Sequence, residues 1–242
     1  MINVLMPLSG GSKFFDSEEY FYPKMLIEIQ GKPMVQHAIE NLQTLHKNLN
    51  FIFVVKRSDC AKFHLDDTLR LLANPDCNII MLDHETKGAA CSALMAIDEI
   101  NNDHPLIISN FDQIIDSDLA VLYSDLEVSN ADAGCFVFDT THPRWSFVLL
   151  DDGGFVVETA EKRPLSRNAI AGFYYFTHGK DFVETAQSMI RKLASNTDTF
   201  FVAPTFNELI LKGKKIKAIR IRNDCYHSFY TPQKIEEYEK GL

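Results

Sequence analysis

MINVLMPLSGGSK, residues 1–13, opens the chain with a short apolar run and a loop that contains two adjacent glycines. The run ends at Pro7, and an apolar run closed by a proline predicts a short buried strand. Gly10 and Gly11 follow within a few residues, so we expect the backbone to turn sharply and to lie exposed after the strand.

Similar apolar runs alternate with segments of helical period through the first half of the chain. The runs lie at residues 2–7, 51–56, 78–82 and 105–110, and the helical segments at residues 34–46, 61–73 and 88–100. This alternation predicts βαβ units and a mostly parallel sheet.

The pattern changes after about residue 130, where four apolar runs follow one another with only turns between them. The turn sequence DDGG, residues 151–154, separates two of them, which predicts antiparallel strands. Trp145 lies in one of these runs and is expected in the core, with stacking on a ligand as the alternative. Two helical segments, a strand and a terminal helix are predicted next, at residues 179–194, 203–213, 215–222 and 231–239.

Composition excludes several classes of protein. The chain has 242 residues and a net charge of −9, and no apolar run approaches the roughly 18 residues that span a bilayer. An acidic chain gains nothing from counterion release, which argues against non-specific nucleic-acid binding. The five cysteines lack CxxC spacing and the N-terminus lacks signal-peptide features. We therefore expect one cytoplasmic domain, residues 1–242, with no nucleic-acid or membrane partner.

Candidate ligand-binding residues follow the predicted strands. A parallel sheet binds its ligands beyond the carboxyl ends of its strands, and residues 8–13, 86–90 and 110–113 occupy such positions. Two glycines let backbone amides approach a polyphosphate closely, and the lysine after them can offset its charge. A glycine pair after a strand is also a common turn, so this stretch alone leaves both interpretations open.

Lys24 and Asp112 are the charged residues whose positions favour a catalytic role. Pro23 fixes the backbone before Lys24, and an apolar segment after it anchors the lysine. Asp112 follows a buried strand, where a carboxylate can hold a Mg²⁺ ion that bridges phosphate oxygens. The alternatives are an ordinary solvated lysine and a helix cap supplied by Asp112, Asp116 or Asp118.

In order along the chain, these and other short motifs resemble those of the nucleotidyltransferases that activate sugar 1-phosphates. The motifs are LSGGSK (8–13), PK (23–24), GKPM (31–34), TKGAA (86–90), NFDQ (110–113), EKRP (161–164), AGFYYF (171–176) and TP (231–232). They span almost the whole chain. The resemblance implies a Rossmann-like, three-layer α/β/α fold of the glycosyltransferase-A type. Its mixed, mostly parallel sheet would have a nucleotide-binding half, residues 1–130, and an antiparallel acceptor-binding half, residues 131–242.

The resemblance also implies the reaction, in which an acceptor phosphate attacks the α-phosphate of an NTP and pyrophosphate leaves. A nucleotide-activated sugar for surface polysaccharide would be the product. The implied catalytic residues are Lys13, Lys24 and Asp112, with Mg²⁺ held by Asp112. The implied nucleotide-binding residues are Leu8, Ser9, Gly10, Gly11, Ser12, Thr86, Gly88 and Ala89, and the implied acceptor-binding residues are Asn110, Glu161, Lys162 and Gly172. Such transfers depend on positioning and electrostatics, so no covalent nucleophile is expected.

Three positions depart from the family pattern. Lys13 stands where the family usually has an arginine, Ser228 where many relatives have a second metal-binding aspartate, and Tyr230 where they have a glycine. One carboxylate still suffices for Mg²⁺ when phosphates and water complete its shell. Asp224 is an alternative second ligand.

Two further hypotheses remain open from the sequence. One is a glycosyltransferase of the same fold that consumes a nucleotide sugar, with Asn110 and Asp112 as its metal-binding pair; Lys24 argues against it, because that reaction has no α-phosphate under attack by a second phosphate. The other is a non-enzymatic nucleotide- or sugar-phosphate-binding module, which Ser228 and Tyr230 favour. The base, the acceptor and the oligomeric state are left open, and surface aromatic residues leave room for a homodimer.

Overall fold

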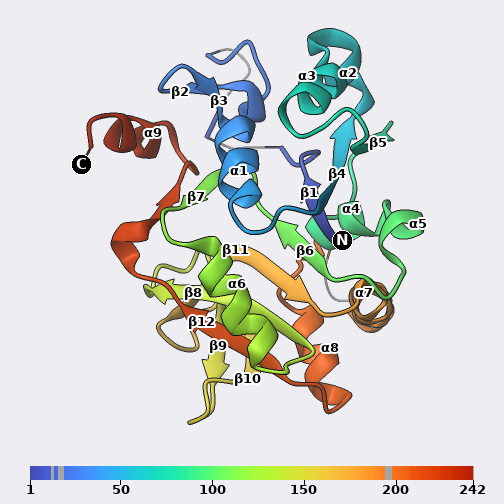
Figure 1. Ribbon diagram of the computed structural model, residues 1–242, viewed down its shortest axis with the longest axis vertical. Helices are drawn as coiled ribbons and strands as arrows, with labels where there is room; N and C mark the ends of the chain where they lie inside the picture. The colour runs from blue at the N-terminus through green and yellow to red at the C-terminus, as the bar shows by residue number, and fades with distance from the viewer. Residues whose placement is uncertain (12–13, 16–18, 194–197, 242) are drawn as a thin grey trace.

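The computed structural model describes residues 1–11, 14–15, 19–193 and 198–241 (Figure 1). Within these ranges, nine strands form one mixed sheet in the order β10-β9-β11-β6-β1-β4-β5, with β8 on the other edge of β11 and β12 beyond it. The strands are β1 (Ile2–Pro7), β4 (Leu49–Lys56), β5 (Asn78–Leu82), β6 (Leu106–Ser109), β8 (Ala133–Asp139), β9 (Ser146–Leu150), β10 (Val156–Glu161), β11 (Asn168–Phe176) and β12 (Ile216–Arg220).

Helices cover both faces of this sheet (Figure 1). One face carries α1 (Met34–Gln43), α2 (Arg57–Phe63), α3 (Leu65–Leu72) and α6 (Leu119–Val128), and the other carries α4 (Ala89–Leu94), α5 (Ile97–Ile100), α7 (Gly179–Leu193) and α8 (Thr205–Leu211). Within the described ranges, no helix is both long and apolar enough to cross a bilayer. The predicted three-layer α/β/α fold is therefore confirmed.

The two cores follow from the alternation of side chains along buried strands. In β1, Val4 and Met6 belong to the core on the α1 side, whereas Leu5 belongs to the core on the α7 side. The same alternation holds in β4, where Phe53 and Ile52 point to opposite faces. Successive side chains of a strand point to opposite faces, so a continuous apolar run fits a strand that is covered on both sides.

The sheet is parallel in its first half and largely antiparallel in its second. β1 pairs in parallel with both β4 and β6, and β4 pairs in parallel with β5. β11 runs antiparallel to β6, β8 and β9, and β9 forms an antiparallel pair with β10 across the predicted DDGG turn. The predicted change in the sequence pattern near residue 130 thus coincides with the change from parallel to antiparallel strands.

Two predicted helices are interrupted. The segment predicted at residues 61–73 is divided between α2 and α3 at His64, which has a left-handed φ of 53°. The segment predicted at 88–100 is divided between α4 and α5. In the first case a single non-glycine residue in the left-handed region ends one helix and redirects the chain into the next, which periodicity alone does not reveal.

Short elements outside the main sheet complete the fold. The pairs β2 (Glu28–Ile29) with β3 (Lys32–Pro33) and β7 (Gln113–Ile115) with β13 (Tyr226–Ser228) are antiparallel. The 3₁₀ helices are η1 (Lys24–Leu26) and η2 (Asn223–Cys225), and the last described helix is α9 (Pro232–Glu239). The β7–β13 pair brings the C-terminal region back to the chain that follows β6.

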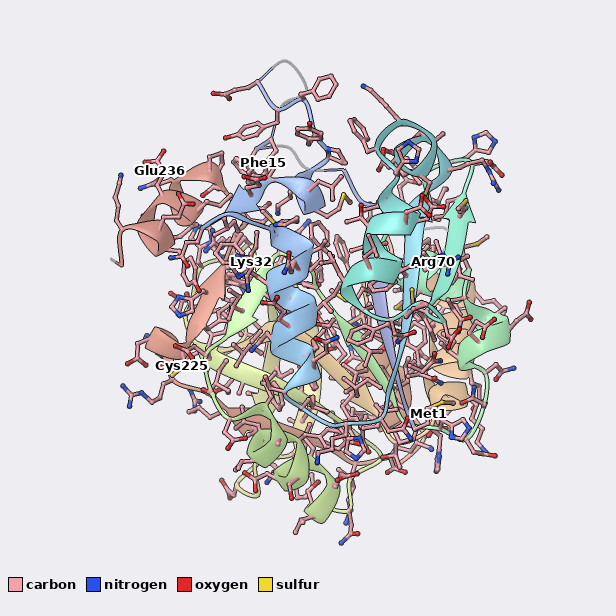
Figure 2. All side chains as sticks on the ribbon, turned by 45° about the horizontal axis from the view of Figure 1, so that its top comes forward. Met1, Phe15, Lys32, Arg70, Cys225 and Glu236 are labelled. Carbon is pink, nitrogen blue, oxygen red and sulfur yellow. The ribbon has the colours of Figure 1, made fainter. Side chains whose placement is uncertain are left out.

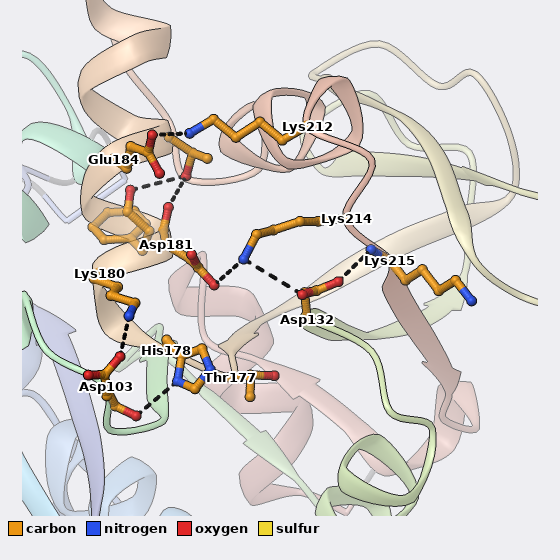
Figure 3. Close-up of polar contacts among 12 residues, drawn as sticks. Asp103, Asp132, Thr177, His178, Lys180, Asp181, Glu184, Lys212, Lys214 and Lys215 are labelled. Atoms are coloured by element: carbon orange, nitrogen blue, oxygen red, sulfur yellow. Dashed lines mark hydrogen bonds and ion pairs between the residues drawn. The ribbon is translucent and has the colours of Figure 1, made fainter.

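Ion pairs connect the start of α7 to two other segments, the one just before β8 and the one just before β12 (Figure 3). The Lys214 ammonium lies 2.7 Å from the Asp181 carboxylate and 3.6 Å from that of Asp132. Asp181 is only 7% exposed at its side chain, whereas the nearby pair of Lys212 with Glu184 has a carboxylate that is 66% exposed. The buried pair is therefore expected to matter more for stability.

Replacing Lys214 by methionine is expected to lower the free energy of unfolding by about 2–4 kcal/mol, because the buried Asp181 carboxylate loses its cation. The matched control is Lys212→Met, which removes an exposed pair and should cost less than about 1 kcal/mol. Urea denaturation of both variants measures the two changes. Equal losses would contradict the assignment of the stability to the buried pair.

Candidate active site

A cavity of about 400 Å³ lies where β6 and β9 meet end to end along β11. β6 pairs with residues 173–176 of β11, and β9 pairs with the same edge of β11 at Ala169. The chain leaving β6 and the chain entering β9 therefore face each other across a gap beside Gly172. Residues 110–112 and 144–146 from these two segments line the cavity.

Lys24 and Asp112 come together in this cavity. The Lys24 ammonium lies 2.5 Å from the Asp112 carboxylate, and the two side chains are only 9% and 18% exposed. Pro23, with φ −61° and ψ 149°, precedes η1 and sets the direction of the lysine as the sequence predicted. Lys24 is therefore not the ordinary solvated lysine that was the alternative.

Aromatic rings surround the Lys24 ammonium. Its distances to the ring centroids of Phe15, Phe111 and Tyr230 are 5.1, 5.6 and 5.7 Å. Phe15 lies at the end of the molecule away from Met1, where the parallel strands end (Figure 2). Ring faces attract a cation and exclude water, so the Lys24 charge acts in a less screened environment than a surface lysine.

Asp118, not Asp112, caps the helix that follows. The Asp118 carboxylate accepts a hydrogen bond of 3.1 Å from the backbone amide of Val121 at the start of α6. Capping therefore does not account for the position of Asp112, and its carboxylate is available to the cavity.

The β7–β13 pair places Ser228 beside Asp112. The amide of Phe229 donates a 2.8 Å hydrogen bond to the Asp112 carbonyl, and Ser228 lies opposite Gln113 in the pair and lines the cavity. Asp224 instead forms an exposed ion pair with Arg222 and lines a neighbouring cavity of about 680 Å³. Asp224 therefore does not replace the second aspartate of the family pattern.

The oxygen atoms of Asp112 and Ser228 are the kind of ligand that Mg²⁺ prefers. In the part of the chain that the structure describes, no cluster of three or more His, Cys, Asp or Glu side chains could hold a metal ion. Mg²⁺ in phosphate-transferring sites keeps one or two carboxylates and completes its shell with phosphates and water. The donor set fits such an ion when it arrives with a polyphosphate.

The glycine loop forms one wall of the cavity. Gly10 and Gly11 are exposed, line the cavity, and leave open space where a side chain would begin. Ser12 and Lys13 lie outside the described residues. Leu8 is buried in the core, and the Ser9 hydroxyl lies 3.1 Å from that of Ser92, so these side chains fix the loop from behind.

The second predicted nucleotide-binding segment meets the chain before α8. Gly88 has a φ of 107°, and a Cβ there would lie 2.5 Å from the Phe200 carbonyl oxygen. The Thr86 hydroxyl donates to the Gly88 carbonyl at 3.2 Å and lies 2.7 Å from the Ser92 hydroxyl. Ala89 lines the cavity. The missing side chain of Gly88 thus makes room for the Phe200 backbone.

The predicted acceptor-binding residues are divided between the cavity and its rim. Glu161 and Asn110 line the cavity; the Ser146 hydroxyl donates a hydrogen bond to the Glu161 carboxylate. Burial raises the pKa of Glu161, against the opposing effects of that hydrogen bond and of Lys162. The Lys162 side chain is exposed, and its ammonium lies 4.5 Å from the ring centroid of Phe201, which lines the cavity.

Gly172 lines the cavity at a point where β11 changes register. Its φ is 57°, and a Cβ there would lie 2.3 Å from the Gln113 amide oxygen and 2.4 Å from the Asn110 amide nitrogen. Its carbonyl accepts hydrogen bonds from the Asn110 backbone amide at 3.0 Å and from the Gln113 side chain at 3.1 Å. Gly172 therefore lets the segment that carries Asp112 approach β11.

Gly172→Ala is expected to destabilise the protein by about 3 kcal/mol or more, because the new methyl group overlaps two side chains and the backbone is left-handed. Gly213→Ala is the matched control, since Gly213 has a φ of 72° but open space around it, and should cost only about 1 kcal/mol. Chemical denaturation compares the two. A Gly172 variant no less stable than the Gly213 variant would contradict the close approach described above.

The sequence prediction missed the side of the cavity formed by the chain entering β9. Arg144 and Ser146 line the cavity, as does Trp145, which was expected in the core. Trp145 is half-buried: it packs on Phe138 and Tyr226 at centroid distances of 5.2 and 5.6 Å while one side faces the cavity. The sequence contains one cue to this side of the cavity, an arginine next to the only tryptophan of the chain. That cue indicates a binding site only when the structure places the start of β9 opposite the end of β6.

Comparisons with known proteins show which proteins this chain resembles. The chain is 26% identical over 204 residues to the UTP–glucose-1-phosphate uridylyltransferase AglF of Haloferax volcanii, covering 82% of this chain and 79% of that protein. It is 26% identical over 224 residues to the bifunctional protein GlmU of Methanocaldococcus jannaschii, covering 91% of this chain but only 49% of that protein. The chain thus spans about half the length of the bifunctional relative.

A solved structure shares the fold over nearly the whole chain. It is the nucleoside-diphosphate-sugar pyrophosphorylase of Vibrio cholerae RC9, with a TM-score of 0.86, 21% identity, and coverage of 98% of this chain and 99% of that one. The sequence model of the family described as nucleotidyl transferase matches residues 10–219. That match includes the glycine loop, Lys24, Asp112 and the chain entering β9. The protein is therefore a member of the nucleotidyl transferase family, as its motifs predicted.

Proposed function

We propose that this nucleotidyltransferase couples an NTP to a sugar 1-phosphate, or to a similar small phosphorylated acceptor, and releases pyrophosphate. The observation that carries the proposal is the Lys24–Asp112 pair, which lies in a cavity whose wall includes Gly10 and Gly11. A nearly buried ammonium beside an open glycine loop is suited to a phosphate group that gains charge during reaction.

In the proposed reaction, an oxygen of the acceptor phosphate attacks the α-phosphorus of the NTP. The new P–O bond forms as the bond from the α-phosphorus to the β-phosphate oxygen breaks, and pyrophosphate leaves with that electron pair. Lys24 offsets charge on the α-phosphate, and Gly10, Gly11 and Ser12 orient the triphosphate through their backbone amides. The attacking phosphate is already anionic at neutral pH, so the chain needs no general base.

Asp112 would hold Mg²⁺ in this site, with Ser228 beside it. The ion, when bound, would neutralise phosphate charge and help to align the triphosphate. The Asp112 carboxylate faces Lys24 in the structure, so a cation on Asp112 would compete with the ammonium and free it for the α-phosphate. Lys13, at the end of the glycine loop, would add charge to the same group.

The proposed division of labour follows the two halves of the chain, within a single domain. The half up to residue 130 would bind the nucleotide through the glycine loop and the segment at 86–89. The half from residue 131 would bind the acceptor through Glu161, Lys162 and Gly172, with Asn110 facing it from the first half. We place the reaction in the cytoplasm, with surface polysaccharide as the destination of the product.

Pyrophosphate release tests the proposal. The protein is incubated with Mg²⁺, each NTP in turn and a panel of sugar 1-phosphates and phosphocholine; UTP with glucose 1-phosphate comes first, because AglF is named for that pair. Release that requires both substrates supports the proposal. Sugar transfer from a nucleotide sugar without release of pyrophosphate would contradict it. Nucleotide binding without turnover of any NTP–acceptor pair would also contradict it, and Ser228 and Tyr230 would explain that outcome.

A further inference from the structure

We infer that Arg144 anchors the phosphate of the acceptor inside the cavity; this inference rests on the proposed function. Arg144 belongs to the chain that enters β9 and lines the cavity across from Asp112. None of the motifs by which the family was recognised includes it.

The Arg144 guanidinium contacts two aromatic rings. Its central carbon lies 4.6 Å from the ring centroid of Trp145 and 5.4 Å from that of Tyr230. Trp145 is itself held by edge contacts with Phe138 and Tyr226. Contacts of this kind restrict the motion of a guanidinium, so Arg144 is positioned before a ligand arrives.

No anion of the described chain pairs with this guanidinium. Four other arginines, Arg57, Arg163, Arg167 and Arg222, form ion pairs with carboxylates, whereas the described residues supply no carboxylate within ion-pair distance of Arg144. Its Nε atom is buried without a hydrogen-bond partner. A buried donor without an acceptor is costly, and the described chain leaves the positive charge of this guanidinium without an anion beside it.

A second cation is what the proposed reaction requires at this position. Tyr230 contacts both Lys24 and Arg144, with its ring centroid 5.7 Å from the ammonium and 5.4 Å from the guanidinium carbon. The reaction brings an anionic acceptor phosphate against an anionic α-phosphate. Lys24 would serve the α-phosphate, which leaves Arg144, the other cation in contact with this ring, for the phosphate that attacks it.

The other acceptor-side charges fit this role less well. Lys162 is exposed and lies over Phe201 at the rim of the cavity, where it would guide the entering anion. Glu161 repels a phosphate when it is ionised, and its hydrogen bond comes from Ser146 rather than from Arg144. A planar guanidinium, moreover, binds two oxygens of one phosphate at once, which an ammonium does not.

Arg144→Gln and Arg144→Lys test the inference, with Arg191→Gln as the matched control because Arg191 is an exposed residue in the last turn of α7. With UTP and glucose 1-phosphate, or the pair found by the substrate panel, we expect Arg144→Gln to raise KM for the acceptor roughly 20- to 100-fold and KM for the NTP less than about 3-fold. Arg144→Lys should recover part of the loss, and the control should change neither constant. An unchanged acceptor KM in a normally folded Arg144→Gln protein would overturn the inference, as would an equal rise in both constants.

Calorimetric titration with inorganic phosphate separates this inference from the proposed function, because it requires no turnover. We expect the wild type to bind phosphate at least 10-fold more tightly than Arg144→Gln. If the wild type releases no pyrophosphate but shows this difference, the proposed function fails and the phosphate site stands. The inference is wrong if phosphate binding is absent or unaffected by the substitution. It is also wrong if Arg144 is needed only for the binding of glucuronate, a sugar that carries a carboxylate and no phosphate, titrated in the same way.

Discussion

Lys24→Met is expected to lower kcat of pyrophosphate release about 10³-fold while KM for the acceptor changes little. Methionine keeps the contacts with Phe15 and Phe111 but removes the charge, so only the stabilisation of the α-phosphate in the transition state is lost. A preorganised charge in a site that largely excludes water stabilises a transition state far more than a surface charge does, and we therefore expect a large fall in kcat. Initial rates at saturating substrates measure it.

The control for this variant is Lys180→Met. Lys180, in the first turn of α7, forms an ion pair with Asp103 at the surface (Figure 3), and neither residue lines the cavity. It also loses one positive charge, so a general effect of net charge on substrate binding would show equally in both variants. A Lys24→Met protein that folds normally and retains more than about a tenth of the wild-type kcat would contradict the role given to Lys24.

Asp112→Asn is expected to lower activity about 10²- to 10³-fold and to raise the Mg²⁺ concentration needed for half-maximal activity. Asparagine has nearly the same shape but carries no charge, and Asp224, the alternative second ligand, pairs with Arg222 instead. Rates of pyrophosphate release across a Mg²⁺ titration measure both effects.

Asp118→Asn is the matched control for that variant. Asp118 caps α6, and asparagine is also a good capping residue, so the control should retain wild-type stability and Mg²⁺ dependence. A Mg²⁺ titration of Asp112→Asn that superimposes on that of the wild type would show that Asp112 holds no metal. Both aspartates were possible helix caps from the sequence, whereas only Asp112 was a candidate metal ligand, and this comparison separates their roles.

Much of the fold could be predicted from the sequence because its information is local. Continuous apolar runs such as β1 and β4 indicate strands covered on both faces, and the DDGG turn indicates a hairpin. Pairs that depend on distant segments were not predictable in this way. β7 and β13 have three residues each, too few for a period, and yet they bring Ser228 beside Asp112.

The candidate site was predictable only in part for the same reason. Lys24 and Asp112 each follow a recognisable local signal, a proline and the end of a buried strand, and the structure brings them to 2.5 Å. Arg144 lies before an antiparallel strand, and its approach to the cavity depends on β6 and β9 sharing one edge of β11. The family resemblance implied Gly88 as a nucleotide-binding residue, but its contact with the Phe200 backbone depends on a segment more than a hundred residues away.

A crystal structure with Mg²⁺ and a non-hydrolysable analogue of the NTP that the substrate panel identifies tests the central claim most directly, since the claim concerns where the triphosphate lies. The account predicts the α-phosphate within hydrogen-bond distance of the Lys24 ammonium, the glycine loop around the triphosphate and the Asp112 carboxylate on the metal. A nucleotide bound outside this cavity, or one whose α-phosphate contacts neither Lys24 nor an ion on Asp112, would contradict it.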